Sequence, residues 1–169
     1  MVMQILGIVG SLGASSSNRQ LLQDAVAAAP PEVKVVLFEQ LGTLPFFNSD
    51  IENNPGPAPV QALRAAIATS DAVLIAAPEY GHSLPGVLKN ALDWLIGSGE
   101  LERKVVAITA SVNHTERGRK GLAALNQTLA AVSAQIIDDG PIVRGAEAAP
   151  ALRKLLEAIV AAIHDKKAE

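Results

Sequence analysis

Two hydrophobic patterns alternate along the chain. Short runs that are almost wholly apolar are separated by longer stretches in which apolar residues recur every third or fourth position. The short runs are typical of strands buried on both faces, and the wider spacing is typical of helices with one buried face. The predicted strands are Met3–Gly10, Val33–Phe38, Ala72–Ala77, Lys104–Ala110 and Ala134–Ile137. The predicted helices are Asn18–Ala29, Val60–Ser70, Pro85–Ile96, Arg119–Ser133 and Pro150–His164.

This regular alternation of strand and helix predicts an α/β fold. Apolar strands joined by helical crossovers form a parallel sheet with helices on both faces. A long connection, residues 39–59, follows the second strand, but no repeat or linker divides the chain, so residues 1–169 are expected to form one domain. In such folds ligands bind at the carboxyl ends of the strands. Three loops are expected there, at residues 10–18, 78–84 and 111–118.

The composition excludes several kinds of site. The chain has 14 basic and 17 acidic side chains, a net charge of −3 and no basic block, which argues against a nucleic-acid partner. Cysteine is absent, which excludes disulfides, thiol catalysis and cysteine-bound metal. The His, Asp and Glu residues show no metal-ligand spacing, so no metal is expected. The first apolar run has no basic flank and is too short for a signal peptide or a membrane span, so we expect a cytoplasmic protein without a membrane partner.

Small polar side chains crowd the first loop, GSLGASSSN at Gly10–Asn18. The loop lacks the lysine of a P-loop and the close glycine pair of a dinucleotide fingerprint, although Glu39 stands about where a ribose-binding acid would be. Hydroxyl groups, a side-chain amide and the free N–H groups of the following helix instead suit a compact phosphate monoester. The candidate phosphate ligands are Ser11, Ser16, Ser17 and Asn18. The alternative is that these residues only cap the helix.

The second loop leads from the third strand into a helix through PEYGHSLPGVLKNALDWL, which starts at Pro78. A turn at Gly81 would direct backbone N–H groups at a planar ligand. His82 is a candidate proton or hydrogen-bond donor, and an exposed loop histidine is the alternative. Glu79 is either a general base or a structural carboxylate. Trp94, the single tryptophan of the chain, belongs either to the core or to a subunit interface.

The whole chain resembles the NADPH-dependent FMN reductase family of flavodoxin-like proteins, which includes quinone, chromate and azo-dye reductases. The signatures of that family run approximately G-S-L-R-x-x-S-x-N and E-Y-N-x-S-x-P-G-x-L-K-N-A-L-D-W, and this chain has GSLGASSSN and EYGHSLPGVLKNALDW. Two positions depart from them: Gly13 stands at the arginine of the first signature, and Gly81 at the asparagine of the second. Arg19 is a candidate to replace the missing charge. The resemblance implies a flavodoxin-like, doubly wound sheet of five parallel strands in the order 2-1-3-4-5.

The resemblance also implies a bound FMN. Its phosphate would lie among the polar side chains of the first loop, and its ring would meet the second loop and the residue after the fourth strand. The implied ring contacts are Pro78, Glu79, Tyr80, Gly81, His82, Ser83 and Ser111.

The implied activity is that of an FMN-dependent NAD(P)H oxidoreductase. A hydride would pass from NAD(P)H to the flavin N5, and electrons would then pass to a small-molecule acceptor such as a quinone, free flavin, chromate or an azo compound, by a ping-pong mechanism. If NADPH is the reductant, Arg117 and Arg119 are candidates to bind its 2′-phosphate, and a solvated basic loop tip is the alternative. Members of the family are usually dimers or tetramers, so we expect a homodimer or homotetramer with the Pro85–Leu95 helix near the interface.

Three other functions stay open on the residues alone. They are a flavodoxin-type electron carrier, a flavin-binding protein that has lost turnover, and a dehydrogenase that binds only a dinucleotide. The departures at Gly13 and Gly81 keep the second of these open.

Overall fold

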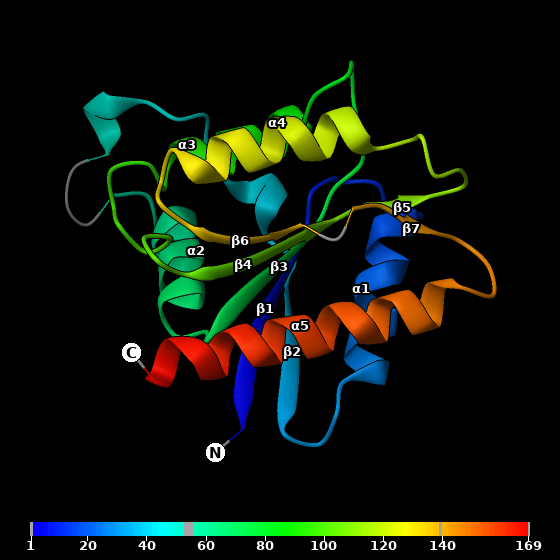
Figure 1. Ribbon diagram of the computed structural model, residues 1–169. Coiled ribbons are helices and arrows are strands. Elements are labelled where there is room, and N and C mark those ends of the chain that lie inside the picture. Colours follow the sequence, from blue (N-terminus) through cyan, green and yellow to red (C-terminus); the bar gives the residue numbers. More distant parts are fainter. Residues whose placement is uncertain (1, 53–55, 139, 169) are drawn as a thin grey trace.

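The computed structural model describes residues 2–52, 56–138 and 140–168, and it confirms the predicted fold class (Figure 1). Five parallel strands form one sheet: β1 (Met3–Val9), β2 (Val33–Phe38), β3 (Ala72–Ala76), β4 (Val105–Thr109) and β6 (Gln135–Asp138). Their order is β2-β1-β3-β4-β6. Because β6 is the fifth strand of this sheet, the expected order 2-1-3-4-5 is confirmed, and the winding reverses between β1 and β3.

Helices cover both faces of the sheet (Figure 1). They are α1 (Ser17–Ala28), α2 (Ala58–Ala68), α3 (Gly86–Asp93), α4 (Arg119–Ala130) and α5 (Ala148–Ala168). One face is covered by α1 and α5, which contribute Leu22 and Ile159 to the core. The other face is covered by α2, α3 and α4, which contribute Leu63, Leu88 and Leu125. All residues of β3 and β4 are buried because helices lie on both sides of them, which explains their uninterrupted apolar sequence.

Some helix ends differ from the sequence-based expectation. Pro85 is the N-cap of α3 rather than part of its first turn, and α3 ends at Asp93, before the predicted end at Ile96. The last helix, α5, is longer than predicted at both ends, and its added first residues, Ala148 and Ala149, are the strong helix former alanine. None of the described helices combines the length and the apolar composition that crossing a bilayer requires.

Two strands of two residues each escape prediction, because so short a segment shows no hydrophobic period. β5 (Ser111–Val112) and β7 (Ile142–Val143) pair in parallel as a separate small sheet just past the end of β4. The connection at residues 39–59 contains two short 3₁₀ turns, η1 (Leu41–Thr43) and η2 (Ser49–Ile51), and its residues 53–55 lie outside the described part.

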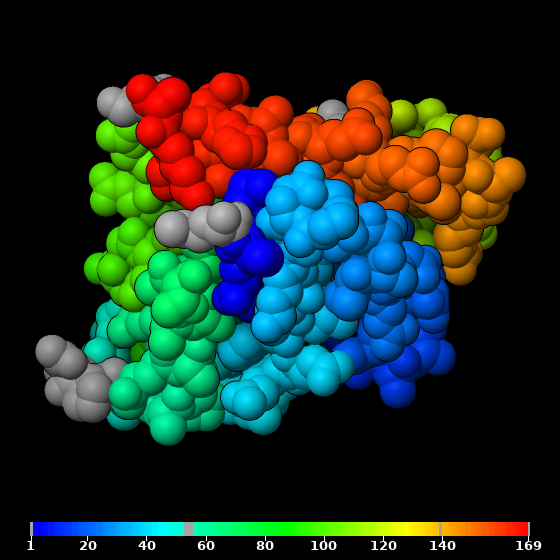
Figure 2. Space-filling view, turned by 90° about the horizontal axis from the view of Figure 1, so that it is seen from below, coloured from blue at the N-terminus to red at the C-terminus, as the bar shows by residue number. Residues whose placement is uncertain are grey.

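The amino ends of the strands are fastened to the last helix. One carboxylate oxygen of Asp71 accepts the Gln4 N–H at 2.8 Å, and the other accepts the Lys167 ammonium at 2.9 Å. Figure 2 views this side of the molecule and shows the first strand (dark blue) emerging between α5 (red) and the turn before β2 (light blue). The three loops of interest lie at the opposite, carboxyl edge of the sheet.

Candidate functional site

The first and third loops are joined directly at the carboxyl edge of the sheet. The Asn18 side-chain oxygen accepts the Ser111 N–H at 2.8 Å, and the Ser17 hydroxyl donates to the Ser111 carbonyl at 3.4 Å. Asn18 is almost completely buried, with 2% of its surface exposed. The structure therefore brings together residues that the sequence assigned to one site from loops 93 positions apart.

The hydroxyl groups of the first loop form a compact cluster at the start of α1. Ser16 is the N-cap of the helix, and its hydroxyl accepts the Asn18 N–H at 3.3 Å. The Ser11 and Ser16 hydroxyls are hydrogen-bonded to each other at 3.1 Å. Capping and phosphate binding are thus compatible, because the other N–H groups of the first helical turn still lack intrahelical acceptors. Hydroxyls, an amide and these N–H groups are a donor set that fits a phosphate monoester.

The family signature has an arginine, and so a positive charge, at the position that Gly13 occupies in this chain. Gly13 faces open space, since a Cβ atom added there would meet nothing within 4 Å. Arg19, the expected substitute, is engaged elsewhere: its Nη1 atom lies 2.7 Å from the Glu39 carboxylate. The same ion pair occupies Glu39, the acid that the dinucleotide hypothesis required, which weakens that alternative.

The second loop contains a tight two-residue turn. The Tyr80 and Ser83 backbones exchange two hydrogen bonds of 3.0 Å, and the intervening Gly81 and His82 have positive φ values of 57° and 62°. Two central residues with positive φ define a type I′ hairpin turn, which glycine adopts freely and histidine adopts at some cost. Their N–H groups have no acceptor among the described residues, and they remain available to a ligand as the sequence suggested.

Glu79 is a structural carboxylate in this arrangement rather than a free base. One of its oxygens accepts the N–H groups of Lys120 at 3.0 Å and Gly121 at 3.1 Å. The other lies 3.2 Å from the His82 ring nitrogen Nδ1. Since the N-cap of α4, Gly118, has no capping side chain, Glu79 caps this helix from the second loop.

These contacts also set the charge state of Glu79. The hydrogen bond from the Gly121 N–H, supported by His82 and the Lys120 N–H, holds the pKa of Glu79 below its ordinary value, although desolvation opposes the shift. The docking of α4 is close, because a Cβ at Gly121 would come within 3.1 Å of the Glu79 backbone. Glycine therefore allows α4 to approach the second loop this closely.

A pocket of about 300 Å³ lies between the second and third loops. Its lining residues are Pro78, Glu79, Ser111, Val112, Asn113, Arg117, Gly118 and Arg144. Three predicted ring contacts are among them, whereas Tyr80 to Ser83 lie on the neighbouring turn and do not line the pocket. Of the two predicted phosphate-binding arginines, Arg117 lines the pocket, and Arg119 instead donates from Nε to the Thr115 carbonyl at 2.9 Å.

Sequence reasoning missed Arg144. Its backbone N–H donates to the Val112 carbonyl at 2.8 Å, an extension of the β5–β7 pairing that the sequence does not reveal. Arg144 and Ser111 also line a neighbouring hollow of about 380 Å³, which reaches Ser17 at the start of α1. The two hollows together connect the first loop to the third.

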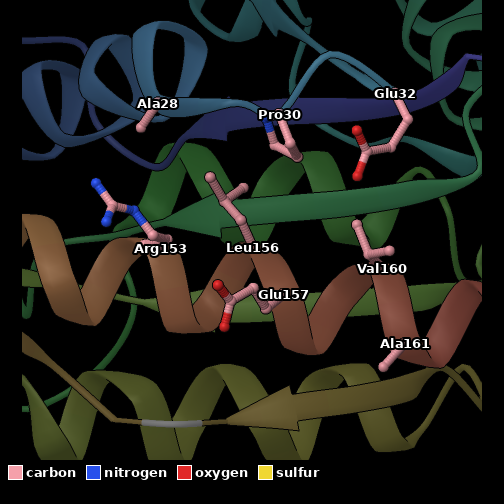
Figure 3. Close-up of a pocket in the computed structure, with 8 residues that line it drawn as sticks. All are labelled: Ala28, Pro30, Glu32, Arg153, Leu156, Glu157, Val160 and Ala161. Atoms are coloured by element: carbon pink, nitrogen blue, oxygen red, sulfur yellow. The ribbon is translucent and has the colours of Figure 1, made fainter.

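Another hollow, of about 410 Å³, lies away from these loops, between α5 and the end of α1 (Figure 3). Its lining includes the buried side chain of Leu156 and the exposed charged residues Glu32, Arg153 and Glu157. It contains no residue that the sequence assigned to a site.

The second signature also has a structural role. Trp94 is fully buried in the chain, and its indole N–H donates to the Pro45 carbonyl at 2.8 Å. Asn90 donates to the same carbonyl at 3.0 Å and accepts the Phe47 N–H at 2.8 Å. The core assignment of Trp94 is thus the correct one, and the two signature residues hold residues 45–47 against α3.

Comparisons with known proteins agree with this arrangement. The sequence pattern of the family described as NADPH-dependent FMN reductase matches residues 3–162. An NAD(P)H-dependent FMN reductase of Pseudomonas aeruginosa is 38% identical over 130 residues, which cover 75% of this chain and 69% of the relative. A quinone reductase of Escherichia coli is 36% identical over 94 residues, or 55% of this chain, and the match spans about half the relative's length (50%).

A solved structure gives the same result for the fold. FerB, a flavoenzyme NAD(P)H:acceptor oxidoreductase from Paracoccus denitrificans, superimposes with a TM-score of 0.85 at 28% identity, covering 97% of this chain and 98% of that one. The fold is therefore flavodoxin-like, as the signatures implied.

Proposed function

The chain belongs to the NADPH-dependent FMN reductase family, and on that premise we propose that it is an FMN-dependent NAD(P)H oxidoreductase. The observation that carries the proposal is the junction of the first and third loops through Asn18 and Ser111, beside the pocket that Pro78 and Glu79 line. Both family signatures contribute residues to this one edge of the sheet. FMN, when bound, supplies the capacity to accept a hydride and to pass electrons on.

We assign the phosphate of FMN to the first loop. Ser11, Ser16, Ser17 and the Asn18 amide would bind it together with the free N–H groups of α1, whose dipole favours an anion. Asn18 has a second task, since its side-chain oxygen also holds Ser111 in place. A change at this residue is therefore expected to affect both the phosphate and the third loop.

We assign the flavin ring to Pro78–Ser83 and Ser111. The type I′ turn presents the N–H groups of Gly81 and His82, and Glu79 keeps the turn against α4. Backbone donors that are fixed in this way can bind carbonyl and ring nitrogen atoms without reorganising. No side chain is needed as a nucleophile or general base, and His82 is the candidate to donate a hydrogen bond or a proton to a reduced acceptor.

The acceptor class that we propose first is a quinone, because curated relatives are quinone reductases. Free flavin, chromate and azo compounds are further acceptors to be screened. If reductant and acceptor use the same exposed face of the flavin, they must bind in turn. We therefore expect ping-pong kinetics, with parallel lines in initial-rate plots of NADPH against a quinone.

The first test is an absorption spectrum of the purified protein with added FMN, before and after NADPH without oxygen. A bound-flavin spectrum that bleaches within seconds supports the reductase. Bound flavin that stays oxidised would indicate a carrier, and protein that binds no flavin would indicate that the changes at Gly13 and Gly81 have removed the cofactor site. Tight NADP⁺ binding without flavin would instead support the dinucleotide-only dehydrogenase.

We also propose that the chain forms a homodimer or homotetramer through the surface around α3. Large apolar side chains are exposed in the connection that packs on α3 and just beyond the helix: Phe46 (88%), Ile96 (56%), Ile51 (46%) and Phe47 (40%). Light scattering after gel filtration tests this. Phe46→Ser with Ile96→Ser should lower the measured mass, and an unchanged mass would contradict the assignment of this surface.

A further inference from the structure

We propose that the groove between α1 and α5 is a self-association surface, in which α5 of one copy of this chain packs antiparallel against α5 of a second copy. This surface is separate from the one proposed around α3, because α1 and α5 cover one face of the sheet and α3 covers the other. It contains none of the residues assigned to FMN, so the inference does not depend on the reductase activity.

The groove consists of two hollows that share residues. The hollow of about 410 Å³ in Figure 3 shares Ala28 and Arg153 with one of about 370 Å³ farther along the two helices. Their floors are formed by the buried leucines Leu21, Leu152 and Leu156. Residues 148–161 of α5 border the groove, which corresponds to about 20 Å of helix. The groove is therefore long enough for a helix of another molecule to lie along it.

The hollow in Figure 3 is basic at one end and acidic at the other. Arg153 lies at the end beside Ala28, and Glu32 lies at the end beside Val160, with Glu157 between them on α5. The three charged side chains have no hydrogen-bond or ion-pair partner among the described residues. A second copy related by a two-fold axis presents the same charges in the reverse order, so its basic end meets the acidic end of the first. The charge pattern is thus complementary to itself.

The exposed row of α5 along the groove has the same two-fold pattern. Ala149, Arg153, Glu157 and Ala161 are all exposed and follow one another at intervals of four residues, so they form one ridge of the helix. A two-fold axis at the level of residue 155 would place Arg153 of each copy opposite Glu157 of the other, and Ala149 opposite Ala161. Each interface would then contain two ion pairs, and the small alanine side chains would let the two helices approach closely.

Arg153 and Glu157 are free to form these pairs. They are four residues apart on one helix, yet they form no ion pair within the chain, and an arginine that precedes the acid is the less favourable order for such a pair. Asp24, the other charged residue of the groove, accepts a hydrogen bond from the Gln20 side chain at 2.9 Å. Because exposed ion pairs are weak and ordering long side chains costs entropy, we expect association to depend on protein concentration.

A different protein is the alternative occupant of the groove. It would have to supply an anion for Arg153 and a cation for Glu157 and Glu32, in the order that matches the groove. A second copy supplies this order by symmetry, and two-fold homodimers are the commonest soluble assemblies. The order of the charges therefore favours a second copy.

The test reverses the two charges one at a time. Arg153→Glu and Glu157→Arg are made in a chain that also carries Phe46→Ser and Ile96→Ser, so that the proposed α3 surface does not contribute to association. Light scattering after gel filtration gives the mass over a range of protein concentrations, and circular dichroism confirms that each variant is folded. Lys154→Glu is the matched control, since it makes the same charge change at an exposed neighbour that lines neither hollow.

The parent chain is expected to be a dimer at high concentration and to dissociate as salt is raised. Each single reversal places like charges opposite one another at two points, which should raise the dimer dissociation constant about 100-fold. Lys154→Glu should leave the constant within about threefold of the parent. Mixing the Arg153→Glu chain with the Glu157→Arg chain should restore a dimer, because each reversed charge then faces an opposite charge of the other chain.

The mixing experiment separates contacts between copies from effects within one helix, which mixing cannot repair. A parent chain that stays monomeric at every concentration overturns the proposal, as do single reversals that stay dimeric. An equal loss in Lys154→Glu would show that net charge controls association and would also overturn it, as would a mixture that remains monomeric.

The other proposals can fail separately. If Phe46→Ser with Ile96→Ser leaves the wild-type mass unchanged, the α3 surface is not an interface, and the charge reversals still test the groove. Because no measurement in this test uses flavin, a chain that binds no FMN would remove the reductase assignment and leave this result intact.

Discussion

The pocket at the carboxyl edge of the sheet and the hollow between α1 and α5 are similar in size, about 300 and 410 Å³. Around the first, side chains from one loop bind backbone groups of another: Asn18 holds Ser111, and Glu79 holds Gly121. Around the second, the charged residues, such as Arg153 and Glu157, have no partners among the described residues (Figure 3). Size therefore does not distinguish the candidate site from the other hollow, whereas polar groups that fix loops to one another do.

The physical difference is one of preorganisation. A ligand that enters the carboxyl-edge pocket meets donors whose positions are set by contacts between residues 41 to 93 positions apart. A ligand in the other hollow would have to order long, solvated side chains, which costs conformational entropy. Substitutions in the carboxyl-edge pocket should therefore alter ligand binding and the free energy of unfolding together. Substitutions in the hollow between α1 and α5 should alter neither strongly.

The largest effect is expected where α4 docks on the second loop. Gly121→Val would place side-chain atoms against the Glu79 backbone and the Ser83 carbonyl, since even a Cβ comes within 3.1 and 3.2 Å of them. Overpacking of this kind should cost about 2 kcal/mol in the free energy of unfolding and lower FMN affinity at least about tenfold. Trp94, fully buried and unique in the chain, gives a fluorescence signal for unfolding.

The control for this variant is Gly86→Val at the start of α3, where an added Cβ meets nothing within 4 Å. It should keep wild-type stability to within about 0.5 kcal/mol. If the two valine variants lost stability equally, the close approach of α4 to the second loop would not be what requires glycine at position 121.

Removing the Glu79 carboxylate should have the next largest effect. Glu79→Ala leaves the first N–H groups of α4 without their acceptor, which should cost about 1 kcal/mol, the usual cost of a lost helix cap. Because the folded state holds the pKa of Glu79 below its ordinary value, this stabilisation is present above the ordinary pKa and is lost as the pH falls through the lowered one. Denaturant titrations at neutral pH and at about pH 3 should therefore show a difference between wild type and variant that shrinks in acid.

A difference that stayed constant with pH would mean that the Glu79 side chain acts through packing instead of charge. Glu79→Gln serves as the control, since it keeps one acceptor oxygen and the shape of the side chain. Its loss of stability at neutral pH should lie between those of the wild type and the alanine variant.

These residues also show what the sequence could predict. The alternation of apolar runs was sufficient for the sheet, because a strand buried on both faces must be apolar throughout. The clustering of Ser11, Ser16 and Asn18 could be predicted because the first loop and the start of α1 are neighbours in sequence. The capping role of Glu79 and the position of Arg144 depend on contacts between distant segments. The position of Arg144 depends on the β5–β7 pair, whose two-residue strands are too short to show a hydrophobic period in the sequence.

Local patterns can mislead for the same reason. Arg117 and Arg119 are equivalent in sequence, yet only Arg117 lines the pocket, because Arg119 lies in the first turn of α4 and donates to the Thr115 carbonyl. The sequence likewise suggests Arg19 as a counter-charge for a phosphate, but in the structure Arg19 forms an ion pair with Glu39.

A moderate gain in binding is expected from Gly13→Arg. The position has open space and an ordinary backbone conformation, so the arginine of the family signature can be restored without strain. One added charge-assisted hydrogen bond should raise FMN affinity by up to about tenfold, and the gain should shrink as salt concentration rises. Gly13→Met, similar in length but uncharged, is the control, and an equal gain in both variants would show that charge is not the cause.

The smallest effect on binding is expected from filling the distant hollow. Ala28 is an exposed residue at the end of α1 that lines this hollow beside Leu156 and Val160. Ala28→Leu adds apolar surface over theirs, which should raise the free energy of unfolding by about 0.5 kcal/mol and leave FMN affinity unchanged. Ser111→Leu, the matching insertion in the carboxyl-edge pocket, should abolish detectable FMN binding while the chain stays folded. FMN affinity is measured by fluorescence titration of both variants. A loss of FMN affinity in Ala28→Leu would contradict the prediction. It would show that the two hollows are coupled through α1, whose first turn carries Ser17 and Asn18.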